Sequence, residues 1–151
     1  MKLTHVSSKG KAEMVDIGSK KMTHREAAAQ GRIYLRPETV QLIKEQNIKK
    51  GEVLAVARIA GISAAKKTSE LIPLCHNIPF NKIDIDFNIK KDVIDIQASA
   101  SCDWKTGIEM EALTAVSVAA LTIYDMCKGV DKEMRITDIK LKEKTKSEIQ
   151  S

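Results

Sequence analysis

The stretch from Ala112 to Ile123 constrains the fold more than any other part of the sequence. Only Thr114, Ser117 and Thr122 are polar within it, and all three are small. A helix that is apolar on nearly all sides has to be buried over most of its surface. The run is too short, and too often interrupted by hydroxyl groups, to be read as a membrane span. The sequence therefore predicts a core helix around which the rest of the chain is organised.

Both ends of this helix are charged. Asp125 and Lys128, near its end, are three residues apart and share a helix face. Such a spacing is typical of an ordinary surface ion pair. It also suits acid–base catalysis, because a carboxylate one turn away can hold and tune an ammonium group.

Two glutamates, Glu109 and Glu111, lie at the start of the helix. Two positions apart on a helix, their side chains diverge by about 160° and cannot serve one face together. In an extended segment that leads into the helix, they would point the same way. The sequence leaves both arrangements open.

Length and charge limit the class of protein. The chain of 151 residues is one domain (1–151, with 1–13 and 145–151 as loosely held ends) and is long enough to bury a core. Its net charge of +5 suits an anionic partner such as a nucleotide, a nucleic acid or a phosphorylated metabolite. A lysine-rich solvated surface would give the same balance.

The cysteines point to a reducing compartment. Cys75, Cys102 and Cys127 form no CxxC pair, and an odd number argues against a disulfide framework. The N-terminal residues have no apolar signal-peptide core. We therefore expect a cytoplasmic protein.

In chain order, the polar segment 14–27 reads as a surface loop and 31–36 as a short strand. Pro37 opens a helix that runs to about Ile48, and a second, Ala-rich helix covers 52–71. We expect the second helix to point these residues inward: Val53, Val56, Ile59, Ala60, Ala64 and Leu71. Gly61 marks a kink or a close contact in it. The prolines at 73 and 79 exclude helix between them.

Two strands with strict alternation follow, at 82–89 and 93–100, and three residues between them suit a hairpin. After the core helix, a final strand covers 134–141 with a break in parity at 137–138 that suggests a bulge. The tail from Glu143 onward reads as frayed. The order is β-α-β-β-α-β if the two adjacent helices form one crossover, which predicts an α+β fold: a ferredoxin-like split βαβ sandwich with an antiparallel sheet and helices on one face.

The first of these two strands carries an unbroken apolar row formed by Ile83, Ile85, Phe87 and Ile89. We expect this row on the sheet face that the helices leave uncovered. An apolar face of that size would have to be buried by something else, such as another copy of the chain.

Cys75 and His76 lie between two prolines, so their positions are rigid. A lone Cys-His pair is a weak sign of nucleophilic catalysis and more often belongs to packing. No second ligand pair stands at structural-zinc spacing. Lys66 and Lys67 precede this loop and suit either a solvated face or a phosphate contact. The sequence has neither a P-loop nor a Rossmann glycine motif.

Four strings in the sequence carry a resemblance to a known family. They are Met14-Val15-Asp16 with Lys20, Thr23 and Arg25-Glu26-Ala27; Ala57-Arg58-Ile59-Ala60-Gly61-Ile62 with Ala64-Ala65-Lys66 and Thr68; Leu71-Ile72-Pro73-Leu74-Cys75-His76; and Thr106 to Leu113 continuing through Leu121 to Lys128. Together, from about Met14 to Lys144, they closely resemble the cyclic pyranopterin monophosphate synthases of molybdenum cofactor biosynthesis (the protein C family). The family's Gly-Gly-Lys-Ser-Gly-like tail is replaced here by Lys146-Ser147-Glu148.

The resemblance implies an enzyme, a phosphorus–oxygen lyase. It would convert 3′,8-cyclo-7,8-dihydroguanosine 5′-triphosphate to cyclic pyranopterin monophosphate and release pyrophosphate. It implies a ferredoxin-like hexamer, a trimer of dimers with active sites at subunit interfaces, and no nucleic-acid or membrane partner. Acid–base chemistry and loss of pyrophosphate need no metal or redox cofactor, although Mg²⁺ would accompany the triphosphate.

The resemblance also assigns roles to residues. Asp125 and Lys128 become the catalytic pair. The substrate-binding residues become Leu74, Cys75, His76, Met110 and Glu111, with Lys50, Lys66, Glu109 and Lys144 around them and Asp16 and Arg25 in a segment that closes over the site. A triphosphate would explain the lysines, and guanine-like N–H groups would need acidic acceptors.

Two other classes of function remain on physical grounds. An RNA-binding RRM has the same β-α-β-β-α-β order and a basic surface, but it needs aromatic side chains on its two central strands. Those strands offer Phe87, and aromatic residues make up 3% of the chain. A regulatory domain that binds a small molecule without catalysis is the other class.

The length of the core helix adds a prediction about the site. Glu111 and Asp125 are fourteen residues apart, so a continuous helix separates them by ~21 Å. A nucleotide-sized substrate could hardly touch both ends. If both ends serve the reaction, one site must take them from different subunits.

Overall fold

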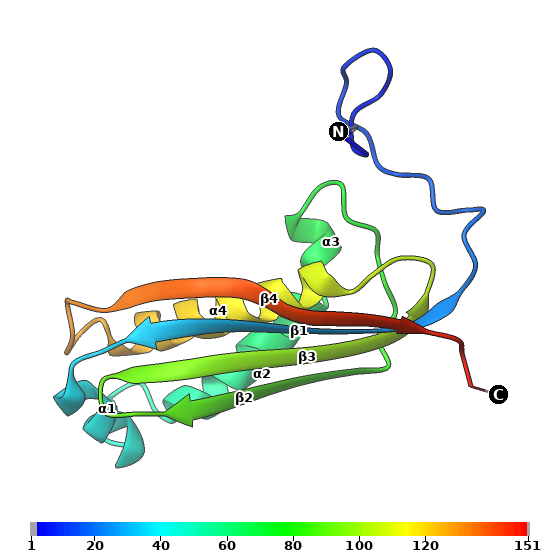
Figure 1. The fold of residues 1–151 in the computed structure, drawn as a ribbon. Coiled ribbons are helices and arrows are strands. Elements are labelled where there is room, and N and C mark those ends of the chain that lie inside the picture. The colour runs from blue at the N-terminus through cyan, green and yellow to red at the C-terminus, as the bar shows by residue number, and fades with distance from the viewer. Residues whose placement is uncertain (1–2, 151) are drawn as a thin grey trace.

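The computed structural model describes residues 3–150. Its elements follow in the order β1 (Thr23–Tyr34), α1 (Pro37–Lys44), α2 (Val53–Ala65), α3 (Thr68–Leu71), β2 (Lys82–Ile89), β3 (Val93–Trp104), α4 (Glu109–Cys127) and β4 (Arg135–Ser147). The strands form one antiparallel sheet in the order β2-β3-β1-β4, and α2 and α4 lie side by side on one face of it (Figure 1). This confirms the predicted α+β fold.

The core helix α4 packs against the sheet and, along its side, against α2. Small residues allow α4 to approach both closely: Ala112, Ala115, Ala119 and Ala120 are fully buried. A Cβ atom on Gly61 of α2 would lie 2.8 Å from the carbonyl oxygen of Ala115 and would collide with Ile85. Gly61 is therefore a close contact rather than a kink. By length and composition α4 could also cross a membrane, but here it is the buried centre of the domain.

The apolar row of β2 lies on the helix side of the sheet. Ile85 is buried, and Ile83, Phe87 and Ile89 pack against the core beneath α2. The expectation that this row is uncovered is wrong, because the strand register sets it opposite the apolar even-numbered positions of β3 and, beyond them, the buried odd-numbered positions of β1, which share the face that the helices cover. The open face instead carries polar side chains, among them Asp84 and Ser99.

The first strand starts eight residues earlier than predicted. β1 pairs with β3 from Thr23 opposite Trp104 to Tyr34 opposite Val93. The Ala27–Ala29 run hides the alternation, since small side chains occur on both faces of the strand. β4 is also longer than predicted and continues through Ser147, so the tail from Glu143 to there is not frayed. The predicted irregularity is confirmed: the register shifts between Gln30 and Arg32, and Asp138 has φ +55°.

The helices differ from the prediction in their ends and in one face. α1 ends at Lys44, and the second helical stretch breaks after Ala65 before the short α3. Val56 and Ile59 are exposed instead of buried, because α2 turns its smallest residues toward α4, and Leu71, at the end of α3, is exposed as well.

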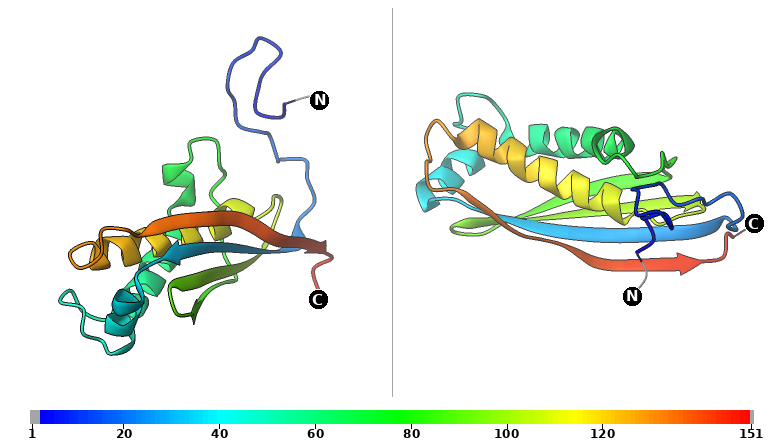
Figure 2. Two further views of the ribbon diagram at one scale, coloured as in Figure 1. Left: turned by 60° about the vertical axis from the view of Figure 1, so that its left-hand side comes forward. Right: turned by 90° about the horizontal axis from the view of Figure 1, so that it is seen from above.

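The segment before β1 leaves the body of the domain. Residues 3–22 project away from the sheet as an extended arm (Figure 2). The Lys105 ammonium group donates a hydrogen bond to the carbonyl oxygen of Gly18 and ties the base of this arm to the loop before α4.

Candidate functional site

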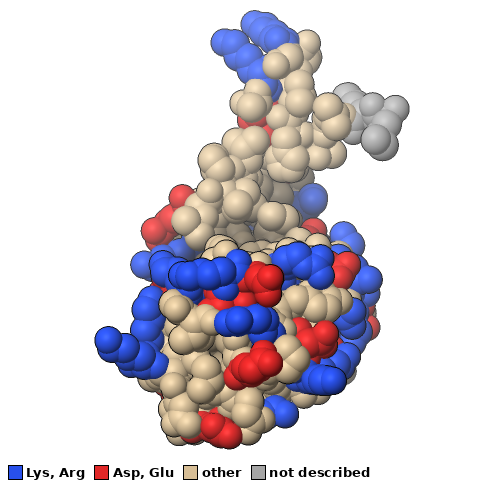
Figure 3. Space-filling view, turned by 90° about the vertical axis from the view of Figure 1, so that its left-hand side faces the viewer, with Lys and Arg blue, Asp and Glu red and all other residues tan. Residues whose placement is uncertain are grey.

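At the C-terminal end of α4, two lysines hold one carboxylate. Lys128 Nζ lies 2.6 Å from Oδ1 of Asp125, and Lys50 Nζ lies 2.9 Å from Oδ2. Lys50 follows α1 and also donates to the Asp125 backbone carbonyl, at 2.9 Å. Figure 3 shows this end of the molecule, where lysine and arginine side chains alternate with acidic ones.

The pairing decides the charge of each group. Hydrogen bonds from Lys128 and then Lys50 lower the pKa of Asp125 to about 2. The hydrogen bond that Lys128 donates to Asp125 raises the pKa of Lys128 above its ordinary value. In the free protein Lys128 is therefore an ammonium group, which suits a proton donor or an anion contact better than a general base.

At the N-terminal end of α4 lies a pocket of about 130 Å³. It gathers six of the predicted residues: Leu74, Cys75, His76, Glu109, Met110 and Glu111, together with His5, Ile78, Thr106 and Gly107. Glu109 and Glu111 both line it although both are helical. Their side chains leave different faces of the helix, and the pocket contacts both because it lies across the end of the helix rather than along one side.

Burial controls the electrostatics of this pocket. Glu111 is 3% exposed, and desolvation raises its pKa to about 7. Desolvation, and then the negative charge of Glu111, raises the pKa of Cys75. Near neutral pH Glu111 can accept or donate a proton, whereas the Cys75 thiol is not activated as a nucleophile.

The remaining predicted residues lie around these two places. Lys144, on β4, has its Nζ 3.8 Å from Oε1 of Glu109 and so belongs to the N-terminal end. Arg25, on β1, donates to the carbonyl oxygens of Trp104 and Lys105 in the strand end and loop before α4. Lys66 ends α2, exposed and outside the pocket. Asp16, in the arm, accepts a hydrogen bond from the Gly18 N–H at 2.8 Å and is likewise outside the pocket.

One continuous helix separates the two places. α4 runs unbroken from Glu109 to Cys127. The fourteen residues between Glu111 and Asp125 then correspond to ~21 Å. A single chain therefore places the cluster of Lys50, Asp125 and Lys128 and the pocket around Glu111 at opposite ends of a rigid element.

Known proteins are similar in sequence to this chain over nearly its whole length. The MoaC family matches residues 14–147. The chain belongs to the MoaC family. The cyclic pyranopterin monophosphate synthase of Peptoclostridium acidaminophilum is 54% identical over 145 residues, which are 96% of this chain and 92% of that protein. The synthase of Thermomicrobium roseum is 55% identical over 94% and 87% of the two chains, and that of Chloroflexus aurantiacus 54% over 92% and 86%.

The structure adds contacts that the MoaC-like strings did not reveal. Lys50 is 75 residues from Asp125 in sequence, so only the fold brings them together. Lys50 and Lys144 have no obvious acidic partner in the sequence, but in the fold they approach Asp125 and Glu109. Asp131, which sequence reasoning passed over, is a fully buried acid close to the C-terminal cluster. An acid three residues after Lys128 was a visible signal, but its burial was not.

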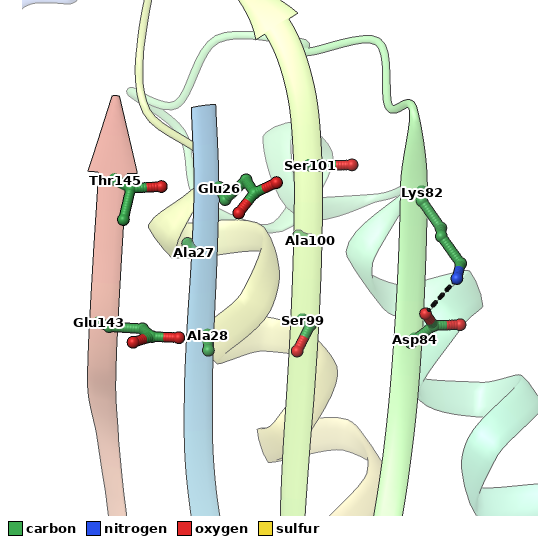
Figure 4. Close-up of a pocket in the computed structure, with 10 residues that line it drawn as sticks. All are labelled: Glu26, Ala27, Ala28, Lys82, Asp84, Ser99, Ala100, Ser101, Glu143 and Thr145. Carbon is green, nitrogen blue, oxygen red and sulfur yellow. Dashed lines mark ion pairs between the residues drawn. The ribbon is translucent and has the colours of Figure 1, made fainter. Parts of the chain in front are cut away.

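The open sheet face has a hollow of its own that takes no part in this arrangement. It has a volume of about 230 Å³ and is lined by short and acidic side chains from all four strands, including Glu26, Ser99 and Glu143 (Figure 4). Its one ion pair joins Lys82 and Asp84. None of the predicted site residues lines it. Within residues 3–150, no three His, Cys, Asp or Glu side chains are grouped closely enough to hold a metal ion.

Proposed function

We propose that this chain is a cyclic pyranopterin monophosphate synthase of molybdenum cofactor biosynthesis. It rearranges 3′,8-cyclo-7,8-dihydroguanosine 5′-triphosphate to cyclic pyranopterin monophosphate and releases pyrophosphate. Membership of the MoaC family and the similarity to three synthases over more than nine-tenths of the chain support this function. The single structural observation that carries the proposal is the pair of chemically different half-sites on α4.

The two half-sites suit the two parts of such a substrate. Glu109 and Glu111 offer acceptors for the N–H groups of a guanine-like ring. Lys50, Lys66, Lys144 and Arg25 offer positive charge for the phosphates. Closing the cyclic phosphate forms one P–O bond and breaks the P–O bond to pyrophosphate. The Lys128 ammonium group, held by Asp125, can stabilise the charge on the departing oxygen or give it a proton. Mg²⁺ would enter with the triphosphate.

Each complete site takes its halves from two chains. The outer side of α4 is partly exposed along Met110, Thr114, Ser117, Leu121 and Tyr124, which recur every three or four residues. Position 118 is halfway between Glu111 and Asp125. A two-fold axis beside it would set two α4 helices antiparallel and bring the acidic end of one to the lysine end of the other. Opposite charges at the two ends favour this pairing over a parallel one.

The oligomer follows from the family resemblance. We propose a hexamer, a trimer of such dimers, in the cytoplasm. The three cysteines are free, as a reducing compartment would keep them.

The activity is tested by incubating the purified chain with the cyclic triphosphate and following pyrophosphate and the pyranopterin. Stoichiometric release of both supports the function. Tight binding of the substrate without turnover would favour a regulatory domain instead, and salt-sensitive RNA binding without turnover would favour an RNA-binding module.

Shared sites are tested by complementation. Lys128→Ala and Glu111→Ala, each inactive alone, are mixed under conditions in which subunits exchange. Mixed oligomers should regain part of the wild-type activity, because some sites then combine two intact halves. Exchange without any recovered activity would place both ends of α4 in one chain's site. Ser117→Cys provides a geometric check, since an antiparallel pair should cross-link near the axis.

A further inference from the structure

Asp131 lies in the turn after α4 and makes an unusually complete set of hydrogen bonds. Its side chain is fully buried. Oδ2 accepts the Arg36 N–H and the Thr39 hydroxyl, both at 2.9 Å, and Oδ1 accepts the Glu133 N–H at 3.0 Å. Three donors therefore converge on one carboxylate from two segments that are far apart in sequence.

These contacts hold the start of α1. Arg36 occupies the N-cap position of α1 and provides no side-chain cap of its own. The Asp131 carboxylate, 95 residues further along the chain, accepts the backbone N–H of this N-cap residue and the hydroxyl of Thr39 in the first turn. A negative charge at this place also suits the positive end of the helix. Burial by itself would raise the pKa of Asp131, but the hydrogen bonds from Arg36, Glu133 and Thr39 outweigh it and lower the pKa, so the carboxylate is ionised.

Asp131 is connected to both lysines of the C-terminal half-site. On one side, its N–H bonds the carbonyl oxygen of Cys127 at 3.0 Å and closes the turn that contains Lys128. On the other side, α1 packs into the core through Val40 and Ile43 and leads to Lys50. One carboxylate thus joins the backbone segments that present Lys128 and Lys50.

The ion pairs alone cannot define the geometry of that half-site. The side chains of Lys50, Asp125 and Lys128 are each at least half exposed. Exposed ion pairs are weak, because water and salt compete with them. The relative positions of the two lysines must therefore come from the backbone that carries them.

From this we infer that Asp131 is a positioning residue: its buried carboxylate fixes the start of α1 to the end of α4 and so holds Lys50 and Lys128 on either side of Asp125. The effect of Asp131 on kcat rests on the proposed function, whereas its effect on the position of Lys50 does not.

The test compares Asp131→Ala and Asp131→Asn in the full chain. Asp131→Ala should lower kcat by about ten- to hundred-fold with a smaller change in KM, because misplaced groups cost rate more than binding. Asp131→Asn keeps one oxygen for Arg36 and Thr39, so it should recover part of the loss. Ile96→Val is the matched control: it removes a buried methyl group from β3, keeps the Asp131 contacts, and should leave kcat near that of the wild type.

A second readout does not need activity. Acetylation of individual lysines by acetic anhydride is followed by mass spectrometry, with exposed Lys140 as internal reference. In both Asp131 variants Lys50 should react about two-fold faster or more, since its Nζ would no longer be held against the Asp125 carboxylate and carbonyl oxygens and would be more accessible to the reagent.

An unchanged kcat in folded Asp131→Ala, or an equal loss in Ile96→Val, would overturn the positioning role. If Asp131→Ala does not fold, the Asn variant decides by the same criteria. If the wild type releases no pyrophosphate, the proposed function fails by itself. The acetylation rate of Lys50 then still tests the positioning role of Asp131: a faster rate in the variants supports this role, and an unchanged rate refutes it.

Discussion

The two ends of α4 place carboxylates in opposite environments. Asp125 is exposed between two ammonium groups, which lower its pKa to about 2. Glu111 is buried beside a second carboxylate, and its pKa rises to about 7. A helix N-terminus ordinarily favours a carboxylate anion, yet at Glu111 the cost of burial prevails. One end of the helix therefore keeps a fixed charge pattern, while the other can exchange a proton at neutral pH.

This difference indicates that the two ends of α4 would have different chemical roles in a shared site. The C-terminal end supplies cations that lie on either side of a permanently ionised acid. The N-terminal end supplies a carboxyl group that changes its charge under working conditions. The Asp125–Lys128 pair and the Glu111 carboxyl group lie at opposite ends of α4, which agrees with the proposal that two chains complete one site.

The largest effect is expected at the cationic end. Lys128→Ala should lower kcat by ~10²–10⁴-fold, the usual contribution of an acid–base group. Lys128→Arg keeps the charge but cannot release a proton near neutral pH. If it restores little activity, proton transfer dominates over electrostatic stabilisation. Steady-state kinetics of pyrophosphate release measure both variants.

The control for this test is Lys44→Ala, an exposed lysine in the last turn of α1 near the same end of the molecule. It should behave like the wild type. The fold should survive Lys128→Ala, because the side chain is more than half exposed. A well-folded Lys128→Ala with wild-type kcat would remove Lys128 from the chemistry.

The burial of Glu111 at the N-terminal end of α4 predicts that the stability of the fold depends on pH. The pKa of Glu111 is about 7 in the folded protein and 4.5 in the reference state, so between these values the folded state binds more protons. The free energy of unfolding should therefore fall as pH rises from about 5 to 8. The contribution of Glu111 is roughly 3 kcal/mol at most. Glu111→Gln resembles the protonated acid at every pH and should lack this decline.

Urea unfolding at pH 5 and pH 8, at one protein concentration, measures the difference. Glu109→Gln is the matched control, because it removes an acid from the same turn whose side chain is about one-third exposed. Parallel stability curves for the wild type and Glu111→Gln would mean that Glu111 is solvated, and the contrast between the two ends of α4 would disappear.

The sequence predicted the elements whose pattern is local. The alternation in β2 and β3 and the apolar run of α4 identify these elements correctly. The start of β1 was missed because Ala27, Ala28 and Ala29 carry no alternation. Ala27 and Ala29 lie in the core that α4 covers, where small side chains let the helix approach, and this is a tertiary fact. The inward face of α2 was assigned to its large residues for the same reason, although Ala57 and Gly61 make the contact.

The sequence names candidate residues of the site, but it does not show how these residues are arranged in space. The family strings named Asp125, Lys128, Glu111 and the Cys75-His76 loop. They did not show that Lys50 pairs with Asp125, that Lys144 approaches Glu109, or that Asp131 is buried, since each of these contacts joins segments far apart in the chain. The burial that raises the pKa of Glu111 is likewise a product of packing, and no local pattern encodes it.

The smallest effects are expected for the lysines outside the Asp125 cluster. Lys66→Gln and Lys144→Gln should each raise KM about two- to five-fold, which corresponds to the contribution of one exposed charge pair. They should also reduce the rise of KM with salt, because one fewer cation attracts the phosphates.

Lys140→Gln, on the exposed β4 edge, controls for the loss of net charge. Lys50→Gln should differ from all three, because Lys50 also holds Asp125, and it should lower kcat as well as raise KM. Equal salt dependence in Lys66→Gln, Lys144→Gln and Lys140→Gln would show that these lysines only solvate the surface, and phosphate binding would then fall to the cationic end of α4 alone.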